Sequence, residues 1–412
     1  MMKILALSHF LWFGGAQISN IEFFDLLKNL AELKIIVCDS TDIRYVIDSK
    51  KIEIYKIPCK TIRKYPIMNI EEISKLVEWA DIVWITDVEY IVSPRIKRLK
   101  NVPLIAHLHS YALICPWWGA LYRSKETCLK RCSIWRITRC KQGINQELAR
   151  IGLLNHAEAD IYWLFDLVKA PLDFLEWKRY VNYDLYKSID GFMPVSQALW
   201  DVYVKHFPEF KCKPSMVIYN PVTEPLKYVN PRINEPYKDY ILYASGSDAL
   251  KGPHLLLKAW QEVSKEFRDL ELFMIGCKNT WIEEKAHKMN LKNIIFAERL
   301  PSREYYHLMY KAKAVVMPSI WPEPFGRIPV EANRLGVPAI VSNRGALPEI
   351  IEDGVTGVVS EASSDSLAEA IAEVISRSWD RGKIIENTWK RINPHNIILK
   401  MLDFFEMILS RM

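Results

Sequence analysis

The 412-residue sequence predicts an α/β protein with two doubly wound domains, and three observations lead to that prediction. Short apolar runs of strand length alternate along the chain with longer segments of helical periodicity, as in parallel sheets covered by helices. The chain is too long for one ordinary hydrophobic core, so two cores are expected. Half of the residues are apolar and a quarter are charged, which is a globular composition.

The first domain is expected to span residues 1–212. Its predicted strands are residues 3–8, 34–38, 52–57, 82–86, 104–109 and 191–196, and its predicted helices are 17–30, 70–79 and 197–207. Ser196 is placed to cap the last of these helices. The loop Gly14-Gly15 follows the first strand, and glycines there let the backbone approach a ligand closely.

Residues 115–186 interrupt this pattern with cysteines, basic residues and a long aromatic segment of helical character. The cysteines are Cys115, Cys128, Cys132 and Cys140. A structural zinc site needs thiolates that converge tetrahedrally, but no C-x2-C pair is present. Zinc, a disulfide, and buried or surface thiols therefore all stay open.

Most apolar side chains of residues 148–186 are expected in the core. Some could instead form a patch that contacts an anionic membrane, because Trp beside Lys and Arg is typical of proteins at a headgroup layer.

The second domain is expected to span residues 213–392, and a last helix residues 393–412. Its predicted strands are residues 240–244, 270–275, 293–297, 314–317, 339–342 and 356–359. A glycine-containing loop that ends in Lys251 follows the first of these strands. A lysine at such a loop before a helix suits phosphate.

The stretch WPEPFGRIPVE, residues 321–331, is the most informative in the sequence. The apolar run before it predicts a buried strand, Pro329 fits the first turn of a helix, and Gly336 fits its end. The loop therefore lies at the carboxyl end of a strand and leads into a helix N-terminus, where open α/β sheets bind ligands. Glu323 and Glu331 could accept hydrogen bonds from sugar hydroxyls, although two glutamates at this spacing also occur by chance.

The sequence around Glu323 and Glu331 distinguishes a functional pair of glutamates from a chance spacing. E-P-F-G-x4-E, followed by G-V-P-A-I-V and G-A-L-P-E-I-I-E-D-G-V-T-G, resembles the retaining GT-B glycosyltransferases (glycosyl transferases group 1, family 4-like). The likeness is dense over residues 240–359 and traceable from residue 3. It implies two Rossmann-like domains facing a central cleft, with the donor nucleotide on the second domain, the acceptor mainly on the first, and the last helix packing back on the first.

The resemblance also assigns roles to residues of the second domain. Glu331 would bind the ribose and Glu323 the donor sugar. Lys251 and the backbone amides near Phe325 and Gly326 would stabilise the diphosphate leaving group.

The first domain would contribute the Gly14-Gly15 loop and His109, which would support the reacting sugar. The family often has H-D-Y where this chain has His109-Ser110-Tyr111, and it usually has an arginine where this chain has Gly246. The arginine contact would be missing or made by Arg299 or Arg327.

The implied activity is transfer of a hexose from a nucleotide-diphosphate sugar to a glycan or lipid-linked acceptor, with retention of configuration and no required cofactor. A sugar-nucleotide hydrolase or epimerase on the same fold is the alternative enzyme. A non-catalytic nucleotide-sugar-binding protein is the alternative class, and Gly246 is the feature that favours it. Neither the base, the sugar nor the acceptor can be deduced from these motifs.

The charge of the chain bears on its partners. The net charge is +6, and residues 1–213 carry 30 Lys and Arg against 24 Asp and Glu. This excess suits an anionic membrane or a phosphorylated acceptor. No helix-turn-helix, RRM or zinc-finger pattern indicates nucleic acid. No apolar run is long enough to predict a membrane span, and eight cysteines do not suggest a secreted disulfide scaffold. A cytoplasmic protein is expected, with the inner face of the membrane as one location.

Overall fold

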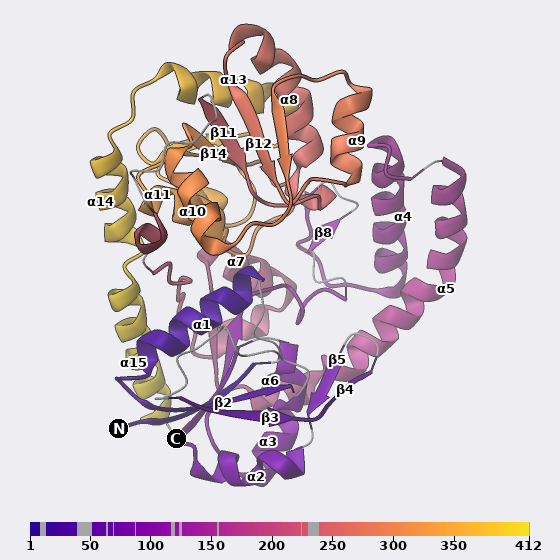
Figure 1. Cartoon of the computed structure of the whole chain (residues 1–412). Coiled ribbons are helices and arrows are strands. Elements are labelled where there is room, and N and C mark those ends of the chain that lie inside the picture. Colours follow the sequence, from indigo (N-terminus) through magenta and orange to yellow (C-terminus); the bar gives the residue numbers. More distant parts are fainter. Residues whose placement is uncertain are drawn as a thin grey trace.

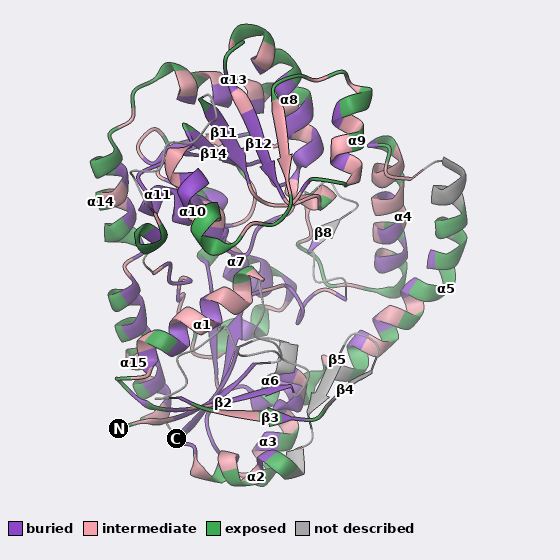
Figure 2. Ribbon diagram, viewed as in Figure 1, coloured by how far each residue is buried: buried purple, intermediate pink, exposed green. Residues whose placement is uncertain are grey.

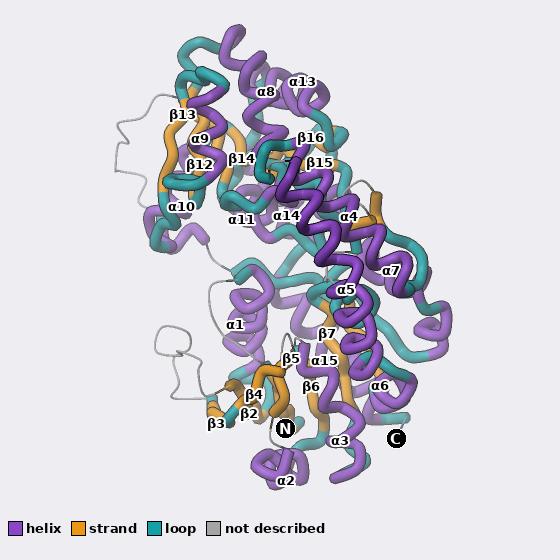
Figure 3. Tube along the Cα trace, turned by 90° about the vertical axis from the view of Figure 1, so that its right-hand side faces the viewer, coloured by secondary structure: helices purple, strands orange, loops and turns teal. Residues whose placement is uncertain are grey.

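The computed structural model describes the chain apart from residues 9–13, 39–51, 63–64, 69, 87, 117–119, 123–125, 155, 224, 230–238 and 412. Within the described ranges, two six-stranded parallel sheets form two domains, one above the other in Figure 1. The turned view in Figure 3 shows helices against both sheets. This is the predicted α/β architecture.

The first sheet has the strand order β10-β7-β6-β1-β2-β3. Its strands are β1 (Lys3–Leu7), β2 (Glu32–Cys38), β3 (Glu53–Ile57), β6 (Ile82–Ile85), β7 (Leu104–Leu108) and β10 (Gly191–Pro194). Apart from half-buried Lys3, the middle strands β1, β6 and β7 are buried along their length, which explains their near-continuous apolar sequences. The order reverses between β1 and β6, which pair in parallel with each other.

The helices of the first domain run between and beside these strands. They are α1 (Gly15–Leu27), α2 (Ile70–Trp79), α3 (Ser93–Leu99), α6 (Tyr183–Ser188) and α7 (Gln197–His206), with short 3-10 turns at Val88–Val92 and Pro208–Cys212. The Ser196 side chain accepts a hydrogen bond from Leu199 N at 3.0 Å, so the predicted cap of α7 is confirmed. Two small antiparallel pairs were not predicted: β4 (Cys59–Ile62) with β5 (Tyr65–Met68), and β8 (Leu121–Tyr122) with β9 (Glu126–Thr127).

The second sheet has the order β13-β12-β11-β14-β15-β16. Its strands are β11 (Tyr240–Tyr243), β12 (Glu271–Ile275), β13 (Ile294–Ala297), β14 (Ala314–Met317), β15 (Ala339–Ser342) and β16 (Gly357–Ser360). Its helices are α8 (Pro253–Glu266), α9 (Trp281–Lys288), α10 (Ser302–Lys311), α11 (Arg327–Arg334), α12 (Leu347–Ile350), α13 (Ser364–Ser376) and α14 (Arg381–Arg391), with 3-10 turns at Pro225–Tyr228 and Ala249–Lys251.

Alternate residues of β11 face two different cores. Ile241 and Tyr243 are buried with side chains of α8 and α13, whereas Tyr240 and Leu242 are buried with side chains of α10 and α11. This alternation follows from the two-residue period of a strand. Helices therefore cover both faces of the sheet, and ligands can reach it only at the ends of its strands.

The last helix, α15 (Pro394–Leu409), packs against the first domain. It contacts α1, and Phe404 and Ile408 lie where a side chain on Gly191 would be. Both ends of the chain lie in the first domain (Figure 1). Residues 214–218 also run beside β10, with Met216 N donating to Phe192 O at 3.0 Å. The domain boundary that we place near residue 212 thus falls just before a segment bonded to the first sheet.

A helical hairpin, α4 (Ile134–Arg150) and α5 (His156–Tyr180), occupies much of the predicted insertion and projects from the side of the molecule (Figure 1). The expectation that most of its apolar side chains lie in the core is wrong. Among the described residues of the hairpin, Ile137, Ala170, Phe174 and Trp177 form a small buried cluster. The reason is that α5 packs mainly along one side, against α4, so its other side faces solvent (Figure 2).

Candidate functional site

The candidate site lies where the strand order of the second sheet reverses. Neighbouring strands β11 and β14 are followed by chain segments that leave in opposite directions, and ligands of open α/β sheets bind in the crevice at such a point. Lys251 follows β11 and Glu323 follows β14. The fold thus brings together two residues that lie 72 positions apart.

The side chains of Lys251 and Glu323 form an ion pair. Lys251 Nζ lies 2.8 Å from Oε1 and 3.0 Å from Oε2 of Glu323, and Ser319 Oγ donates to Oε1 at 2.7 Å. The Lys251 ammonium also lies 4.3 Å from the ring centroid of Trp321. Glu323 is buried and Lys251 is about a fifth exposed, so the pair is open to ligand on the lysine side.

Two glycines let the loops approach closely enough to form this pair. Gly252 has a φ of 73°, and a side chain there would lie 1.9 Å from Pro318 O. Gly345 has a φ of 60°, and a side chain there would lie 2.3 Å from the backbone of Glu323. Both positions require glycine, since other residues rarely adopt positive φ and would collide with backbone. These two glycines therefore help to fix the backbone on which Glu323 sits.

Helix α11 begins directly after this loop. Its N-cap residue Gly326 has a φ of 92° and supplies no side-chain cap. The first amides of the helix, near Phe325 and Gly326, are therefore not capped by a side chain and point to the crevice end, where an anion is favoured. The Phe325 ring itself is buried, 5.9 Å from the ring of Tyr219.

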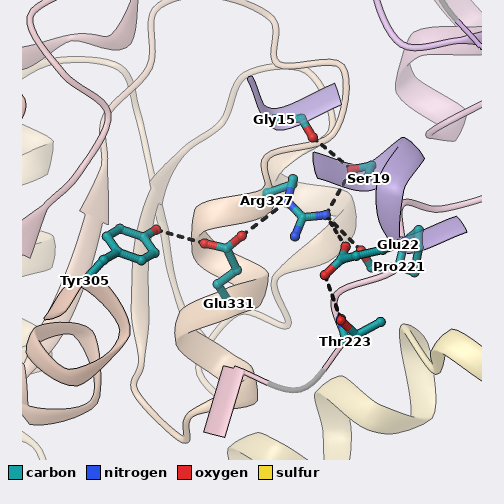
Figure 4. Close-up of polar contacts among 8 residues, drawn as sticks. All are labelled: Gly15, Ser19, Glu22, Pro221, Thr223, Tyr305, Arg327 and Glu331. Atoms are coloured by element: carbon teal, nitrogen blue, oxygen red, sulfur yellow. Dashed lines mark hydrogen bonds and ion pairs between the residues drawn. The ribbon is translucent and has the colours of Figure 1, made fainter. Parts of the chain in front are cut away.

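Glu331 lies one turn into α11 and is also buried. Tyr305 donates to Oε2 at 2.8 Å and Arg327 Nε donates to Oε1 at 3.2 Å (Figure 4). Each carboxylate oxygen thus has one partner and keeps a lone pair for another donor.

Arg327 joins the two domains. Its Nη1 donates to Ser19 Oγ at 2.9 Å, to Glu22 Oε2 at 2.6 Å and to Pro221 O at 2.9 Å (Figure 4). Burial lowers the pKa of Arg327, but the carboxylates of Glu22 and Glu331 outweigh burial and raise it. The guanidinium is therefore a fixed positive charge. Its Nη2 is buried and has no hydrogen-bond partner in the described part of the chain.

His109 follows β7 of the first sheet and approaches this cluster from the other domain. Both of its ring nitrogens are buried without a partner among the described residues. Burial and the nearby charge of Arg327 lower the pKa of His109 to about 3. The imidazole is therefore neutral near pH 7 and can both donate and accept a hydrogen bond.

The glycine loop of the first domain also reaches this place. Gly14 is the cap residue of α1 and Gly15 its first residue. A side chain on Gly15 would lie 3.7 Å from Arg327 Cδ, so the start of α1 lies beside the start of α11. The earlier part of that loop lies outside the described residues.

Arg299 lies close to the position where the resembled family has an arginine. Gly246, which occupies that position, lies 3.1 Å from where a side chain on Gly276 would begin, and Arg299 Cγ lies 3.9 Å from the same point. Arg299 is exposed and follows β13, the edge strand of the sheet. Of the two substitutes expected from the sequence, Arg327 is engaged with Glu22 and Glu331, whereas Arg299 has no ion pair among the described residues.

The four cysteines of the insertion are not disulfide-bonded, and Cys132 interacts electrostatically with the other three. Burial and the three other cysteines raise the pKa of Cys132 to about 12. Burial raises the pKa of Cys128, but hydrogen bonds from His206 and Arg136 lower it to about 7 overall. As placed, no three His, Cys, Asp or Glu side chains in the described ranges are arranged to hold a metal ion. Outside this group, Cys38 is disulfide-bonded.

Several contacts across the domain interface had no assigned role in the sequence. Tyr111 donates to Pro322 O at 2.8 Å and Ser196 donates to Pro324 O at 2.6 Å, so hydroxyls of the first domain hold both sides of Glu323. Glu349 accepts hydrogen bonds from the first amides of α7 at 2.8 and 3.0 Å. Glu349 belongs to the G-A-L-P-E string, which could have drawn attention to it. No motif in the sequence includes Glu22.

Comparison with known proteins finds a family match in the second domain. Residues 230–391, which include Lys251, Glu323 and Glu331, match the family Glycosyl transferases group 1. The match covers less than half of the chain.

A curated relative and two solved structures extend the comparison. Spore coat protein SA of Bacillus subtilis (strain 168) is 28% identical over 158 residues, which are 36% of this chain and 42% of that protein. The chain thus spans less than half the length of this relative.

The solved structures are similar over almost the whole chain. Anabaena Alr3699/HepE, in complex with UDP-glucose, has a TM-score of 0.67 at 16% identity, covering 99% of this chain and all of that one. WaaG, a glycosyltransferase involved in lipopolysaccharide biosynthesis, has a TM-score of 0.61 at 14% identity, covering 97% and 98%. The fold is therefore GT-B.

Proposed function

We propose that the protein is a retaining glycosyltransferase that moves a hexose from a nucleotide-diphosphate sugar to a glycan or lipid-linked acceptor. The observation that carries this proposal is the Lys251–Glu323 pair at the switch point of the second sheet, beside the start of α11. A cation and an uncapped helix N-terminus suit a diphosphate, and a buried carboxylate suits sugar hydroxyls. The match of residues 230–391 to Glycosyl transferases group 1 supports the same assignment.

The donor would lie along the second domain. Lys251 and the amides near Phe325 and Gly326 would contact the diphosphate, Glu331 the ribose, and Glu323 the sugar. The Gly14-Gly15 loop would close over the diphosphate from the first domain. The UDP-glucose in the complex of Alr3699/HepE is a donor of this class, which supports a uridine nucleotide as the first to test.

In the proposed reaction the acceptor oxygen forms a bond to the anomeric carbon while the bond from that carbon to the phosphate oxygen breaks. The acceptor proton passes to the leaving phosphate on the same face of the sugar, so configuration is retained. Lys251 and the α11 amides would stabilise the negative charge that grows on the diphosphate. Neutral His109 would hydrogen-bond the reacting sugar from the opposite domain. No cofactor enters these steps.

The testing experiment is ligand-observed NMR with UDP-, GDP- and ADP-sugars on the wild type and on Glu331→Ala. The binding signal of one donor should be present with the wild type and absent with the variant. Glu298→Ala, an exposed residue in the loop before α10, is the matched control and should bind as the wild type does. Binding that is unchanged in Glu331→Ala would contradict the assignment.

Turnover is the second readout. Slow donor hydrolysis, followed by release of nucleoside diphosphate, separates an enzyme from a sugar-nucleotide-binding protein. Addition of an acceptor extract should accelerate that release if the protein is a transferase and should leave it unchanged if it is a hydrolase.

A further inference from the structure

Helix α5 exposes an unusual amount of apolar surface. Large side chains along its outer side are between two fifths and two thirds exposed, with Phe165 at 64% and Val168 at 67%. The stripe consists of Ile161, Leu164, Phe165, Val168, Leu172 and Leu175. Figure 2 shows this side of the hairpin as exposed. Contiguous apolar surface of this kind marks an interaction site in a protein that stays in solution.

The stripe is not a misplaced core, because α5 already has an inner face. Asp166, Ala170, Phe174 and Trp177 are buried, at the spacing of one helix side, and pack toward α4. At about 100° per residue, the stripe lies on the opposite side of the helix. The helix is therefore apolar on two faces, and only one of them has a partner in the described structure.

The charges around the stripe are of one sign. Lys169, Lys178 and Arg179 are exposed. Asp166 and Asp173 of the same helix turn inward, where buried Lys141 lies 2.8 Å from Asp173 and 3.5 Å from Asp166, and Glu176 is half-buried. Along Ile161–Arg179, excluding the side chain of residue 163, the exposed charged side chains are therefore all basic. An anionic surface would complement them.

The width of the stripe indicates what kind of partner would cover it. A seam between two helices needs only a narrow line of positions three and four residues apart, such as Phe165, Val168 and Leu172. Leu164 and Leu167 are also exposed, at 59% and 42%, and widen the apolar arc beyond such a seam. A broad apolar arc flanked by Lys and Arg is typical of helices that lie in a membrane interface.

We propose that the outer face of α5 binds the headgroup layer of an anionic lipid membrane and lies parallel to its plane. None of the helices in the described ranges is long and apolar enough to cross a bilayer, so the attachment would be peripheral. The inference stands independently of the proposed transferase activity, because it uses no residue of the candidate site.

The hairpin is joined to both domains, so its attachment would orient the whole molecule. Trp177 Nε1 donates to Ala112 O at 2.9 Å, three residues beyond His109. Lys285 Nζ donates to Ile151 O at 2.8 Å, which ties the far end of α4 to the second domain. A membrane-bound α5 would hold the crevice at a fixed angle to the lipid surface.

The test is flotation of the full chain with phosphatidylcholine vesicles, with and without phosphatidylglycerol, at low salt. The wild type should float with the anionic vesicles and stay behind with the neutral ones. In the triple variant Lys169→Glu/Lys178→Glu/Arg179→Glu the partition coefficient should fall about 100-fold or more, since each basic residue near an anionic surface contributes roughly 1 kcal/mol. The control Lys258→Glu/Lys265→Glu/Lys288→Glu makes the same charge change on exposed positions of α8 and α9 and should still float.

A second variant tests the apolar stripe. Phe165→Ser/Val168→Ser/Leu172→Ser should abolish flotation while the circular dichroism spectrum and melting temperature stay close to wild type, because these side chains face solvent. Leu399→Ser, at an exposed apolar position of α15, should change nothing. Wild type that does not float with anionic vesicles would overturn the proposal. So would a wild-type dimer in analytical ultracentrifugation that the serine variant converts to a monomer, because a second copy would then cover the stripe.

Discussion

Lys251 Nζ and the carboxylate of Glu323 are bound to each other, at 2.8 and 3.0 Å. In the proposed complex the same two groups serve different parts of the donor, the diphosphate and the sugar. The donor would therefore have to separate them and provide each with a new partner. Ser319 and the backbone contacts from Tyr111 and Ser196 hold Glu323 in place while this happens.

Glu323→Gln should reduce kcat/KM by about 10- to 100-fold, because a charge-assisted hydrogen bond to the sugar becomes a neutral one. The fold should be retained, since glutamine fills the same volume. Steady-state transfer with the donor found by NMR measures the effect. The control is Glu298→Gln. Full activity in Glu323→Gln would refute the role that we assign to this carboxylate.

Arg299→Ala should weaken binding of the nucleoside diphosphate about 10-fold. The expected cause is the loss of one partly solvated contact between the guanidinium and phosphate at the place left open by Gly246. Isothermal titration calorimetry measures the change. Arg303→Ala, at an exposed position of α10, removes the same charge a few residues away and should bind normally. If the wild type and Arg299→Ala bound the nucleoside diphosphate equally well, Arg299 would not replace the arginine contact that is missing at Gly246.

The histidine at the domain interface should make stability depend on pH. The pKa of His109 is lowered to about 3 in the folded state, so between that value and the unfolded value near 6.5 the unfolded chain binds the extra proton. The contribution of His109 to the free energy of unfolding is fully present above about pH 6.5 and decreases as the pH falls toward 3. Between pH 7 and pH 5 the wild type should lose about 2 kcal/mol more than His109→Asn.

Urea unfolding at the two pH values measures that difference. The exposed residue His395 provides the control, and His395→Asn should follow the wild type. His254 also has a lowered pKa, chiefly from burial, but it remains in all three proteins and cancels in the comparison. The pKa of His107 is lowered by burial and by His109, so its contribution decreases together with that of His109 in the variant. A wild type and a His109→Asn variant with parallel pH profiles would contradict the burial of a neutral imidazole.

Arg327→Met should lower the free energy of unfolding by about 3–5 kcal/mol, because it leaves the carboxylates of Glu22 and Glu331 buried without their cation. A double-mutant cycle with Glu22→Gln should give a coupling energy of about 0.5–3 kcal/mol. Urea unfolding followed by tryptophan fluorescence gives both values. Arg303→Met is the control, and additive effects of the two interface substitutions would show that the pair does not couple the domains.

The strands and helices were predictable where periodicity and end signals coincide. The run at 314–317 became β14, and Pro329 and Gly336 lie at the start and just past the end of α11. The sequence placed Lys251 and Glu323 after two strands of the second domain, and the resemblance assigned both to the donor. Which neighbours those strands have, and therefore which loops meet, needed the structure.

Other features depend on tertiary contacts that leave no local pattern. Glu22 pairs with Arg327 across 305 residues, and no spacing predicts such a partner. The apolar residues of α5 were misassigned to the core because helical periodicity reports that a face is apolar without reporting what covers it. The same limitation applies to the cysteines, whose spacing left their arrangement open.

The contact between Lys251 and Glu323 has a consequence for selectivity. A free phosphate or a nucleotide without a sugar could attract Lys251, but it would leave Glu323 buried beside Ser319 with no cation and no hydroxyl to replace it. A complete nucleotide sugar satisfies both groups at once. For the donor complex that we propose, the resting ion pair therefore discriminates against the incomplete donor and against the spent product, which would leave the crevice as the two residues rejoin.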